Sequence, residues 1–368
     1  MKHTCKKLLA LMLALTFALA LFGCGGEEEE SAEIITEPGS SEQAETDANG
    51  QPVPTQPADD RIFNPLTGEA GYSAEALAQK AVAIVVENHP AARPQWGMNS
   101  PDIIMEYEVE GGISRMLWIY ADSSTVPEYV GPVRSARHDI VELARGWDLV
   151  FVHCGGSTEG LALISTYGSA LSDFDVMTHS ACTYRASTRD VALEHRLVLV
   201  GSKLRTELVN YGVDTEADPE KRTPLSFTKP EAPRTLAGGE SQGVHFEYSG
   251  AYTYDFTYDA AAGTYLRAIN GKPMTDEFSV NCVYDNVIVL YVDMQSRNDS
   301  SGHQDLLLEN GGSGLYFCGG RYEEIKWEKG EGADPLKLLT SDGEPLTLNP
   351  GRSYIGFVRS TQAGKTSY

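Results

Sequence analysis

The stretch from Glu106 to Asp139 holds the side chains of this sequence that are best suited to chemistry. Glu106, Glu108 and Glu110 are spaced by two, so an extended strand places all three carboxylates on one face. Like charges at that spacing repel one another unless water, arginines or a cation compensates them. Three interpretations are open: a solvated acidic face, a network paired with arginines, or a calcium site.

Two arginines and a histidine follow the turn at 131–132, at the start of a helix expected over 135–145. Cations at a helix start oppose the helix dipole, so Arg134, Arg137 and His138 need a partner that offsets this cost. That partner is either a carboxylate of the protein, such as Asp139 or one of the three glutamates, or an anionic ligand. Amides at a helix start and guanidinium groups bind anions together. Both interpretations are open.

A glycine turn, Gly155-Gly156-Ser157, follows a strand expected over 148–153. Ligands of open α/β sheets bind at the edge where a strand leads into a helix. Ser157 suits a helix N-cap, and the two glycines let the backbone approach a ligand closely. The segment does not match the G-x-S-x-G elbow, so we expect no catalytic nucleophile at Cys154 or Ser157.

These features together predict an arginine-lined anion site. It consists of eight residues: Arg93, Arg115, Arg134, Arg137, His138, Gly155, Gly156 and Ser157. A second basic group extends the site if the fold brings the two together, and is otherwise scattered over the surface: Arg185, Arg189, His195 and Arg196. No cysteine pair has C-x-x-C spacing, so no structural zinc site is predicted, and no cofactor is expected.

The elements that must position these residues alternate between strands and helices from 61 to 227. Strands are expected at 81–87, 103–110, 114–120 and 148–153, and helices at 135–145, 158–168 and 194–211. A Pro-, Gly- and Glu-rich stretch at 228–243 predicts a linker. Residues 244–360 are expected to form strands and turns, and residues 361–368 a tail. The fold class predicted is an α/β N-terminal domain followed by a smaller, mostly-β C-terminal domain.

The N-terminus has the layout of a secretory signal. Residues 1–23 combine three lysines with an apolar run at 8–22, and Gly23 precedes Cys24. This resembles a bacterial lipobox, in which the cysteine is diacylated and becomes the new N-terminus; a plain signal peptide or an uncleaved anchor is the alternative. Residues 24–60 are acidic and poor in large apolar side chains, so we expect a disordered tether. The protein is therefore predicted to be extracytoplasmic, anchored to the cell membrane by lipidated Cys24.

The net charge and the cysteine content of the chain limit its possible ligands and its possible disulfides. The chain has 52 acidic and 29 basic side chains and a net charge of −23, which disfavours binding to nucleic acid. Two cysteines fall in each half of the folded part, so one disulfide per half and four free thiols are both open. They are Cys154, Cys182, Cys282 and Cys318.

Five segments carry long and specific motifs: NPLTG (64–68), VVENHPAARPQWGMNSPDIIMEYEVEGGISRMLWIY (85–120), GPVRSAR (131–137), VHCGGS (152–157) and DGEPLTLNPGRSYIGFV (342–358). Together they resemble the YerB-like family, bacterial lipoproteins common in Firmicutes and built on a domain of unknown function, DUF3048. The resemblance implies a two-part extracytoplasmic body and no established catalytic role. One departure lies after Arg185 and Arg189, where a Pro-His-Asn segment of the family is replaced by Leu-Glu-His-Arg (193–196).

The preferred interpretation is a non-enzymatic binding or scaffolding lipoprotein. Its expected partners are the membrane, through the N-terminal lipid, and an anionic cell-envelope ligand or an envelope protein. One alternative is an envelope hydrolase that uses His153, His195 or one of the three glutamates as acid or base. The other is a protein–protein interaction module.

Overall fold

The computed structural model describes residues 60–221 and 223–368. The chain divides into two units, Met1–Ala58 and Asp59–Tyr368, and only the second is described below. The predicted signal peptide, the lipidation site Cys24 and the predicted tether apart from Asp60 lie outside the described residues.

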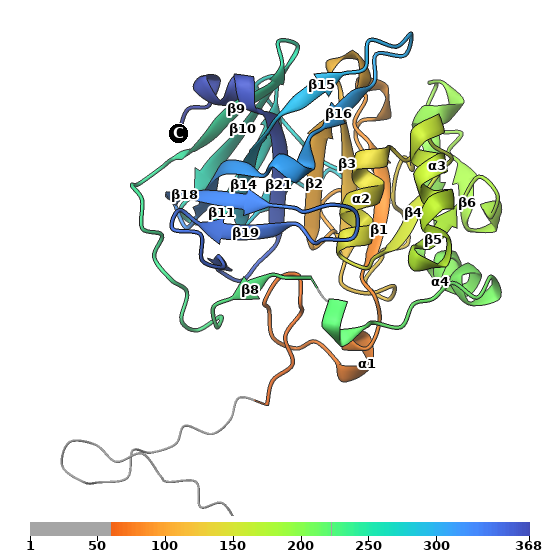
Figure 1. Ribbon diagram of the computed structural model, residues 1–368, viewed down its shortest axis with the longest axis horizontal. Helices are drawn as coiled ribbons and strands as arrows, with labels where there is room; N and C mark the ends of the chain where they lie inside the picture. The colour runs from red at the N-terminus through yellow and green to blue at the C-terminus, as the bar shows by residue number, and fades with distance from the viewer. Residues whose placement is uncertain (1–59, 222) are drawn as a thin grey trace, which may run out of the picture. The chain divides into compact units, whose positions relative to one another are not determined.

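A mixed ten-stranded sheet runs through both halves of the described chain (Figure 1). Its strand order is β19-β18-β17-β14-β21-β2-β3-β1-β4-β5. Strands β1 to β5 come from the first half and the others from the second, and the two sets join where β2 pairs in parallel with β21. Strands β1, β4 and β5 are parallel to one another, so their carboxyl ends lie at one edge.

The first half contains all four α-helices of the described residues: α1 (Ala74–Leu77), α2 (His138–Gly146), α3 (Thr158–Tyr167) and α4 (Gly201–Asn210). Its strands are β1 (Val82–Glu87), β2 (Ile103–Glu108), β3 (Ser114–Tyr120), β4 (Val150–His153), β5 (Ser172–Asp175), β6 (Thr183–Arg185), β7 (Leu197–Leu199) and β8 (Ser226–Phe227).

The second half is mostly strands. They are β9 (Gly243–Ser249), β10 (Tyr252–Asp259), β11 (Thr264–Ile269), β12 (Lys272–Pro273), β13 (Val283–Tyr284), β14 (Asn286–Val292), β15 (Met294–Ser296), β16 (Gln304–Leu306), β17 (Gly312–Cys318), β18 (Arg321–Glu328), β19 (Lys337–Thr340), β20 (Thr347–Leu348) and β21 (Ser353–Arg359).

The central strands are buried on both faces, which explains why β1 and β3 read as nearly unbroken apolar runs. On one face, Val85 and Leu117 pack with Ile140 and Leu143 of α2. On the other face, the core includes Trp118 together with side chains of α4 and of a second sheet. The sheet therefore separates two hydrophobic cores, one on each face.

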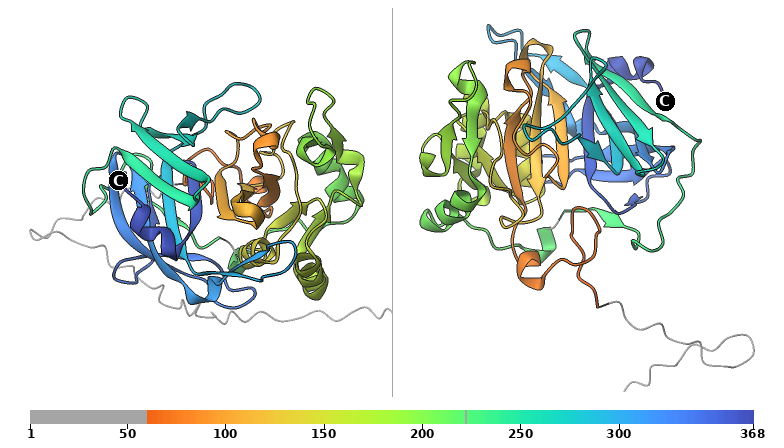
Figure 2. Two further views of the ribbon diagram at one scale, coloured as in Figure 1. Left: turned by 90° about the horizontal axis from the view of Figure 1, so that it is seen from above. Right: turned by 180° about the vertical axis from the view of Figure 1, so that it is seen from behind.

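The second sheet has the order β12-β11-β10-β9, with β13 paired to β11. Its strand β9 lies against β2 and β21 of the ten-stranded sheet. Phe246 of β9 stacks on Tyr254 and Phe256 of β10, with ring centroids 5.6 and 6.0 Å apart. The view from behind shows this sheet in front of the C-terminal strands (Figure 2). Phe256 also contacts the ring of Tyr354 in β21, with centroids 4.5 Å apart, so aromatic packing joins the second sheet to the ten-stranded sheet near the junction of the two halves.

The predicted fold class is confirmed: an N-terminal mixed α/β part is followed by a part made mostly of strands. Two local predictions are wrong. The helix expected over 194–211 begins at Gly201, because Val198 and Leu199 are fully buried in strand β7. Helix α2 begins at His138 rather than at 135, so Arg134 lies in the loop before it and Arg137 is its N-cap residue.

Two further findings concern the described residues. Cys154, Cys182, Cys282 and Cys318 are all free thiols, which decides between the alternatives left open by their spacing. No helix in the described part of the chain is long and apolar enough to cross a membrane.

Candidate anion-binding site

A pocket of about 400 Å³ opens beside the carboxyl ends of β1 and β4. Ligands of open α/β sheets favour this edge because loops and helix starts converge there. The pocket is lined by Glu87, His89, Glu110, Ile113, Arg115, Arg134, Ser135, Arg137, Gly156, Ser157, His195, Ser301 and His303. We call it the arginine pocket.

Arg115 is the most unusual side chain of the arginine pocket. It is the second residue of strand β3, lies opposite Glu87 of β1 and is only 2% exposed. Its Nη1 donates to the Ser135 carbonyl at 2.8 Å, whereas Nε makes no hydrogen bond. Among the described residues no carboxylate lies within 4.0 Å of its guanidinium group, the limit of an ion pair. Burial, and then the nearby Arg137, lower the pKa of Arg115 to about 10.

Arg134 and Arg137, by contrast, each have a carboxylate. Arg134 Nε lies 3.2 Å from Glu87 Oε1, in ion-pair contact but without hydrogen-bond geometry. Arg137 Nε donates to Glu110 Oε1 at 2.8 Å, and its Nη2 also contacts that oxygen. Although burial opposes it, the Arg137 charge lowers the pKa of Glu110 below its usual value. Two of the three cations are thus compensated within the protein.

Glu87 also holds a histidine in the arginine pocket. It ends strand β1 with 1% exposure, and its Oε2 lies 2.9 Å from Nδ1 of His195. His195 belongs to a short 3₁₀ helix, η5 (Leu193–Arg196), and its ring stacks on that of His89. The buried carboxylate therefore contacts Arg134 through one oxygen and His195 through the other.

The glycine turn closes the pocket beside α3. Ser157 is the N-cap of this helix, and its Oγ accepts from the Gly160 amide at 3.1 Å. A side chain at Gly156 would lie 3.1 Å from Leu161 and 3.3 Å from the Ala136 carbonyl. Because the backbone at Gly156 lies so close to Leu161 and Ala136, only glycine fits at this position without a shift of its neighbours.

The β15–β16 hairpin supplies the wall that comes from the second half of the chain. Ser301 and His303, between these two strands, line the arginine pocket. His303 Nδ1 lies 2.7 Å from Asp299, and its Nε2 lies 3.5 Å from Glu110. The site is consequently assembled from both halves of the chain.

Five of the eight residues predicted for the anion site line one pocket: Arg115, Arg134, Arg137, Gly156 and Ser157. The other three lie outside that lining. Arg93 donates to the Asn88 side chain at 2.9 Å and lies over the Tyr252 ring. His138 lines a small neighbouring pocket, where it contacts Asp139 and Asp305. Gly155 adjoins the lining residue Gly156.

Only His195 of the second basic group joins the arginine pocket. Arg189 instead covers the Trp96 ring at 3.6 Å and pairs with Glu277. Arg185 and Arg196 donate to backbone carbonyls nearby. The second basic group therefore extends the anion site by one residue, His195.

Each of the three glutamates spaced by two is paired with an arginine, as one of the three interpretations predicted. Glu106 pairs with Arg267, Glu108 with Arg359 and Glu110 with Arg137. Among the described residues no group of three or more His, Cys, Asp or Glu could hold a metal ion.

Burial, reinforced by Asp175, raises the pKa of the Cys154 thiol, which disfavours its nucleophilic form.

Six lining residues were missed by sequence reasoning: Glu87, His89, Ile113, Ser135, Ser301 and His303. Glu87 and His89 follow directly from the end of β1, so the rule on carboxyl ends of parallel strands could have indicated them. The two hairpin residues depend on pairing between the two halves, which no local pattern reveals.

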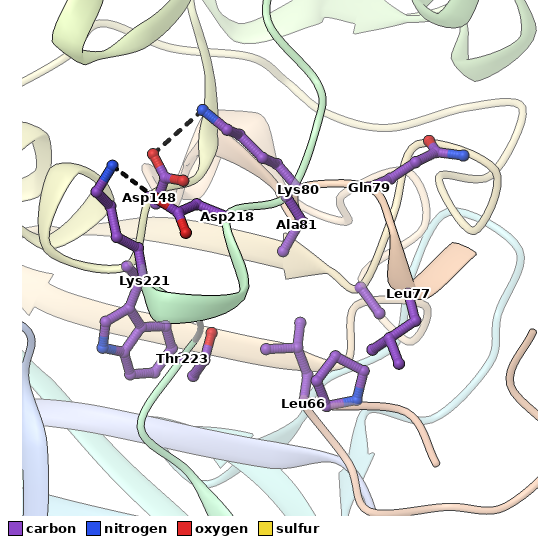
Figure 3. Close-up of a pocket in the computed structure, with 13 residues that line it drawn as sticks. Leu66, Leu77, Gln79, Lys80, Ala81, Asp148, Asp218, Lys221 and Thr223 are labelled. Atoms are coloured by element: carbon purple, nitrogen blue, oxygen red, sulfur yellow. Dashed lines mark ion pairs between the residues drawn. The ribbon is translucent and has the colours of Figure 1, made fainter. Parts of the chain in front are cut away.

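A second, smaller pocket lies at the opposite, amino end of β1 (Figure 3). Its volume is about 40 Å³. Lys80 in this pocket contacts Asp148 at 3.2 Å and Asp214 at 2.8 Å, and Lys221 pairs with Asp218. Its cations are therefore compensated, unlike Arg115.

Two family models cover most of the folded chain. The "Protein of unknown function (DUF3048) N-terminal domain" matches residues 66–214, and the corresponding C-terminal domain matches residues 244–355. The chain belongs to the DUF3048 family. The arginine pocket takes residues from both parts of this DUF3048 body.

A curated DUF3048 relative and a solved structure agree with this assignment. The Bacillus subtilis protein named "Putative lipoprotein YerB" is 31% identical over 315 residues, which span 83% of this chain and 89% of the relative. The crystal structure of the YerB protein from Bacillus subtilis is similar with a TM-score of 0.71 and 29% identity, over 83% of this chain and 99% of that one. No activity accompanies the DUF3048 description.

Proposed function

We propose that this protein is a membrane-anchored extracytoplasmic lipoprotein that binds the anionic group of a cell-envelope ligand in the arginine pocket. The observation that carries the proposal is Arg115, a guanidinium group with 2% exposure and no carboxylate partner. A buried charge is costly unless it is paired, so native proteins rarely keep one without a reason. An anionic ligand supplies that reason.

The charge of the arginine pocket supports this. Three arginines and two glutamates line it, so one cation exceeds the internal acids before any histidine is counted. This local excess of positive charge lies in a protein whose net charge is −23. A cationic recess on an acidic body attracts anions to that place rather than to the rest of the surface.

The expected location of the protein limits the classes of anion that it can meet. The relative named as a lipoprotein and the signal-like N-terminus both support a folded body outside the cytoplasm, and the lipobox-like residues 21–24 favour a tether at Cys24. Anions available there include the stem carboxylates of peptidoglycan and the phosphates of teichoic polymers. Such binding would also give the protein a scaffolding role, because a body that is anchored to the membrane by a lipid and binds the cell wall connects the membrane to the wall.

The hydrolase alternative has less support. Among the described residues no serine, threonine or cysteine side chain hydrogen-bonds to His89, His153 or His195. Of the three glutamates, Glu106 accepts from the Ser114 hydroxyl, but both side chains are buried and Glu106 is paired with Arg267. Nucleophilic catalysis needs such a contact between nucleophile and base. A protein-interaction role stays compatible with the arginine pocket if the anion is a carboxylate of a partner protein.

Co-sedimentation of the full-length protein, in neutral detergent, with purified cell-wall material tests the proposal. The wild type should bind, and raising the salt concentration should weaken binding because the attraction is electrostatic. The pair Arg134→Gln/Arg137→Gln should bind at least tenfold more weakly. A matched control is Lys203→Gln/Lys272→Gln, which removes the same charge from two exposed positions outside the pocket.

The control variant should bind like the wild type. Equal binding by the wild type and the Arg134/Arg137 variant would contradict the proposal, as would an equal loss in both variants. The first result would mean that the arginine pocket does not take part in binding the cell wall. The second would mean that binding depends on the overall charge of the protein and not on the pocket.

A further inference from the structure

Two histidines of the arginine pocket form a stacked pair. The rings of His89 and His195 have centroids 4.6 Å apart and planes inclined by 7°. His89 follows β1 and His195 lies in η5, so two distant segments place them together. Two groups that can both become cationic are held face to face, beside three arginines.

The Nδ1 atom of each ring is occupied within the protein. His89 Nδ1 accepts the Ala91 amide at 3.1 Å, so the proton of the neutral ring is on Nε2, which is a donor. His195 Nδ1 faces Glu87 Oε2 at 2.9 Å, and a carboxylate only accepts, so Nδ1 carries the proton. Neither Nε2 has a hydrogen-bond partner among the described residues. One donor and one proton acceptor thus remain for a ligand.

Charged groups from several elements surround the pair. Carboxylates come from Glu87 of β1 and from Glu110 after β2, arginines from β3 and from the loop before α2, and a further histidine, His303, from the β15–β16 hairpin. Burial, and then repulsion by His195, lower the pKa of His89 below its usual value, with smaller contributions from Arg93 and Arg134. An anion placed beside the rings would offset this repulsion and favour proton uptake.

We infer that the anionic group bound in the arginine pocket is a phosphate, held by Arg115 together with the stacked His89–His195 pair, and that its binding is coupled to proton uptake. This inference rests on the proposed function. Donors reach the pocket from β3, the segment after β1 and the loop before α2, and His195 of η5 adds one when its Nε2 takes up a proton, which suits a tetrahedral group better than a planar carboxylate.

Two further properties favour phosphate. A phosphate monoester has a second pKa of about 6, close to that of histidine, so both can exchange a proton near neutral pH. A carboxylate titrates well below that range. The pocket volume of about 400 Å³ falls in the usual range for small-molecule sites, so the phosphate would belong to a larger molecule such as a glycerol phosphate.

Isothermal titration calorimetry of the full-length protein in neutral detergent tests the inference. The probes are glycerol 3-phosphate and N-acetyl-D-alanine, titrated at pH 6.5 in two buffers with different protonation enthalpies. Glycerol 3-phosphate should bind at least tenfold more tightly than the carboxylate. The buffer dependence of its heat should show net proton uptake, which His89→Gln/His195→Gln should abolish.

The matched control is His245→Gln, because His245 pairs with Asp255 on the second sheet, outside the arginine pocket. It should leave both affinity and proton uptake unchanged. Phosphatidic acid, whose headgroup is a phosphate monoester, should compete with glycerol 3-phosphate when it is added to the micelles, if the source of the phosphate is a lipid headgroup. It should not compete if the source is a soluble phosphate monoester.

Different failures have different meanings. Equal or tighter binding of N-acetyl-D-alanine would overturn the phosphate inference and leave the proposed anion site standing. Undiminished proton uptake in the His89/His195 variant would overturn the role of the histidine pair. If neither probe binds, and cell-wall material does not bind either, the proposed function itself fails.

Discussion

Arg267 Nη2 lies 2.7 Å from Glu106 Oε2, and both side chains are completely buried. Arg267 belongs to β11 of the second sheet and Glu106 to β2 of the ten-stranded sheet, so the pair joins the two sheets. Tyr254 and Tyr354 also donate to Glu106, each at 2.8 Å. Arg115 is almost as deeply buried as Arg267, but no carboxylate lies in ion-pair contact with it; Glu87 and Glu110 act on its charge only from a longer distance.

Removing the Arg267 charge should destabilise the protein strongly. Arg267→Met leaves Glu106 buried without a cation, and we expect a loss of about 3–5 kcal/mol in the free energy of unfolding. Urea denaturation measures it. Adding Glu106→Gln should recover part of that loss, because the orphaned charge is then gone.

The exposed pair of Lys365 and Glu247 provides a control for this experiment. Lys365→Met should change the free energy of unfolding by less than about 1 kcal/mol. A similarly small effect of Arg267→Met would show that the pair between the sheets contributes little.

The protonation of His153 should make stability depend on pH. Its Nδ1 faces the Gly155 carbonyl at 2.7 Å and its Nε2 faces Asp173 Oδ1 at 2.8 Å, so both nitrogens donate only in the protonated ring. Burial opposes the charge, but these partners prevail and raise the pKa of His153 above its usual value. The resulting stabilisation is complete below the unfolded-state pKa of 6.5 and is lost as pH rises through the raised value.

Asp173→Asn should therefore cost more stability at pH 5.5 than at pH 8.5, as measured by denaturation at both pH values. Asp255→Asn, which alters the half-exposed pair with His245, provides the comparison and should show a smaller pH dependence. A cost of Asp173→Asn that is equal at both pH values would contradict this, because it would mean that the protonation of His153 does not change between them.

Local patterns in the sequence account for much of this fold. Strand β3 has the predicted bounds, and β1 begins one residue later than expected, because short apolar runs match buried strands. The pairing of β2 with β21 could not be predicted, since it joins residues about 250 positions apart in the chain. That pairing also explains why the strands of both halves form one sheet.

The candidate site was predictable to a similar extent. Arg134 and Arg137 could be selected because cations near a helix start need a partner, and the structure provides Glu87 and Glu110. Sequence reasoning could not show that Arg115 would be the one left without an acid. Whether a buried arginine has a partner depends on packing between strands and loops, which spacing does not encode.

Replacing Cys24 tests the predicted anchor. Cys24→Ser removes the thiol that would be diacylated, so the protein should move from the membrane fraction to the medium or to the soluble extracytoplasmic fraction. Immunoblotting of cell fractions measures this, with Cys154→Ser as the control that keeps the lipobox. Membrane retention of Cys24→Ser would contradict lipid anchoring at this residue.

The most direct test of the anion site is the free energy of unfolding of Arg115→Met with and without an added anion. Without anion, the variant should be as stable as the wild type or up to about 2 kcal/mol more stable, because an uncompensated buried charge has been replaced by an apolar side chain. Saturating glycerol 3-phosphate or N-acetyl-D-alanine should stabilise the wild type but not the variant. A loss of about 3 kcal/mol in Arg115→Met without anion, or equal stabilisation of both proteins by the anion, would contradict the account.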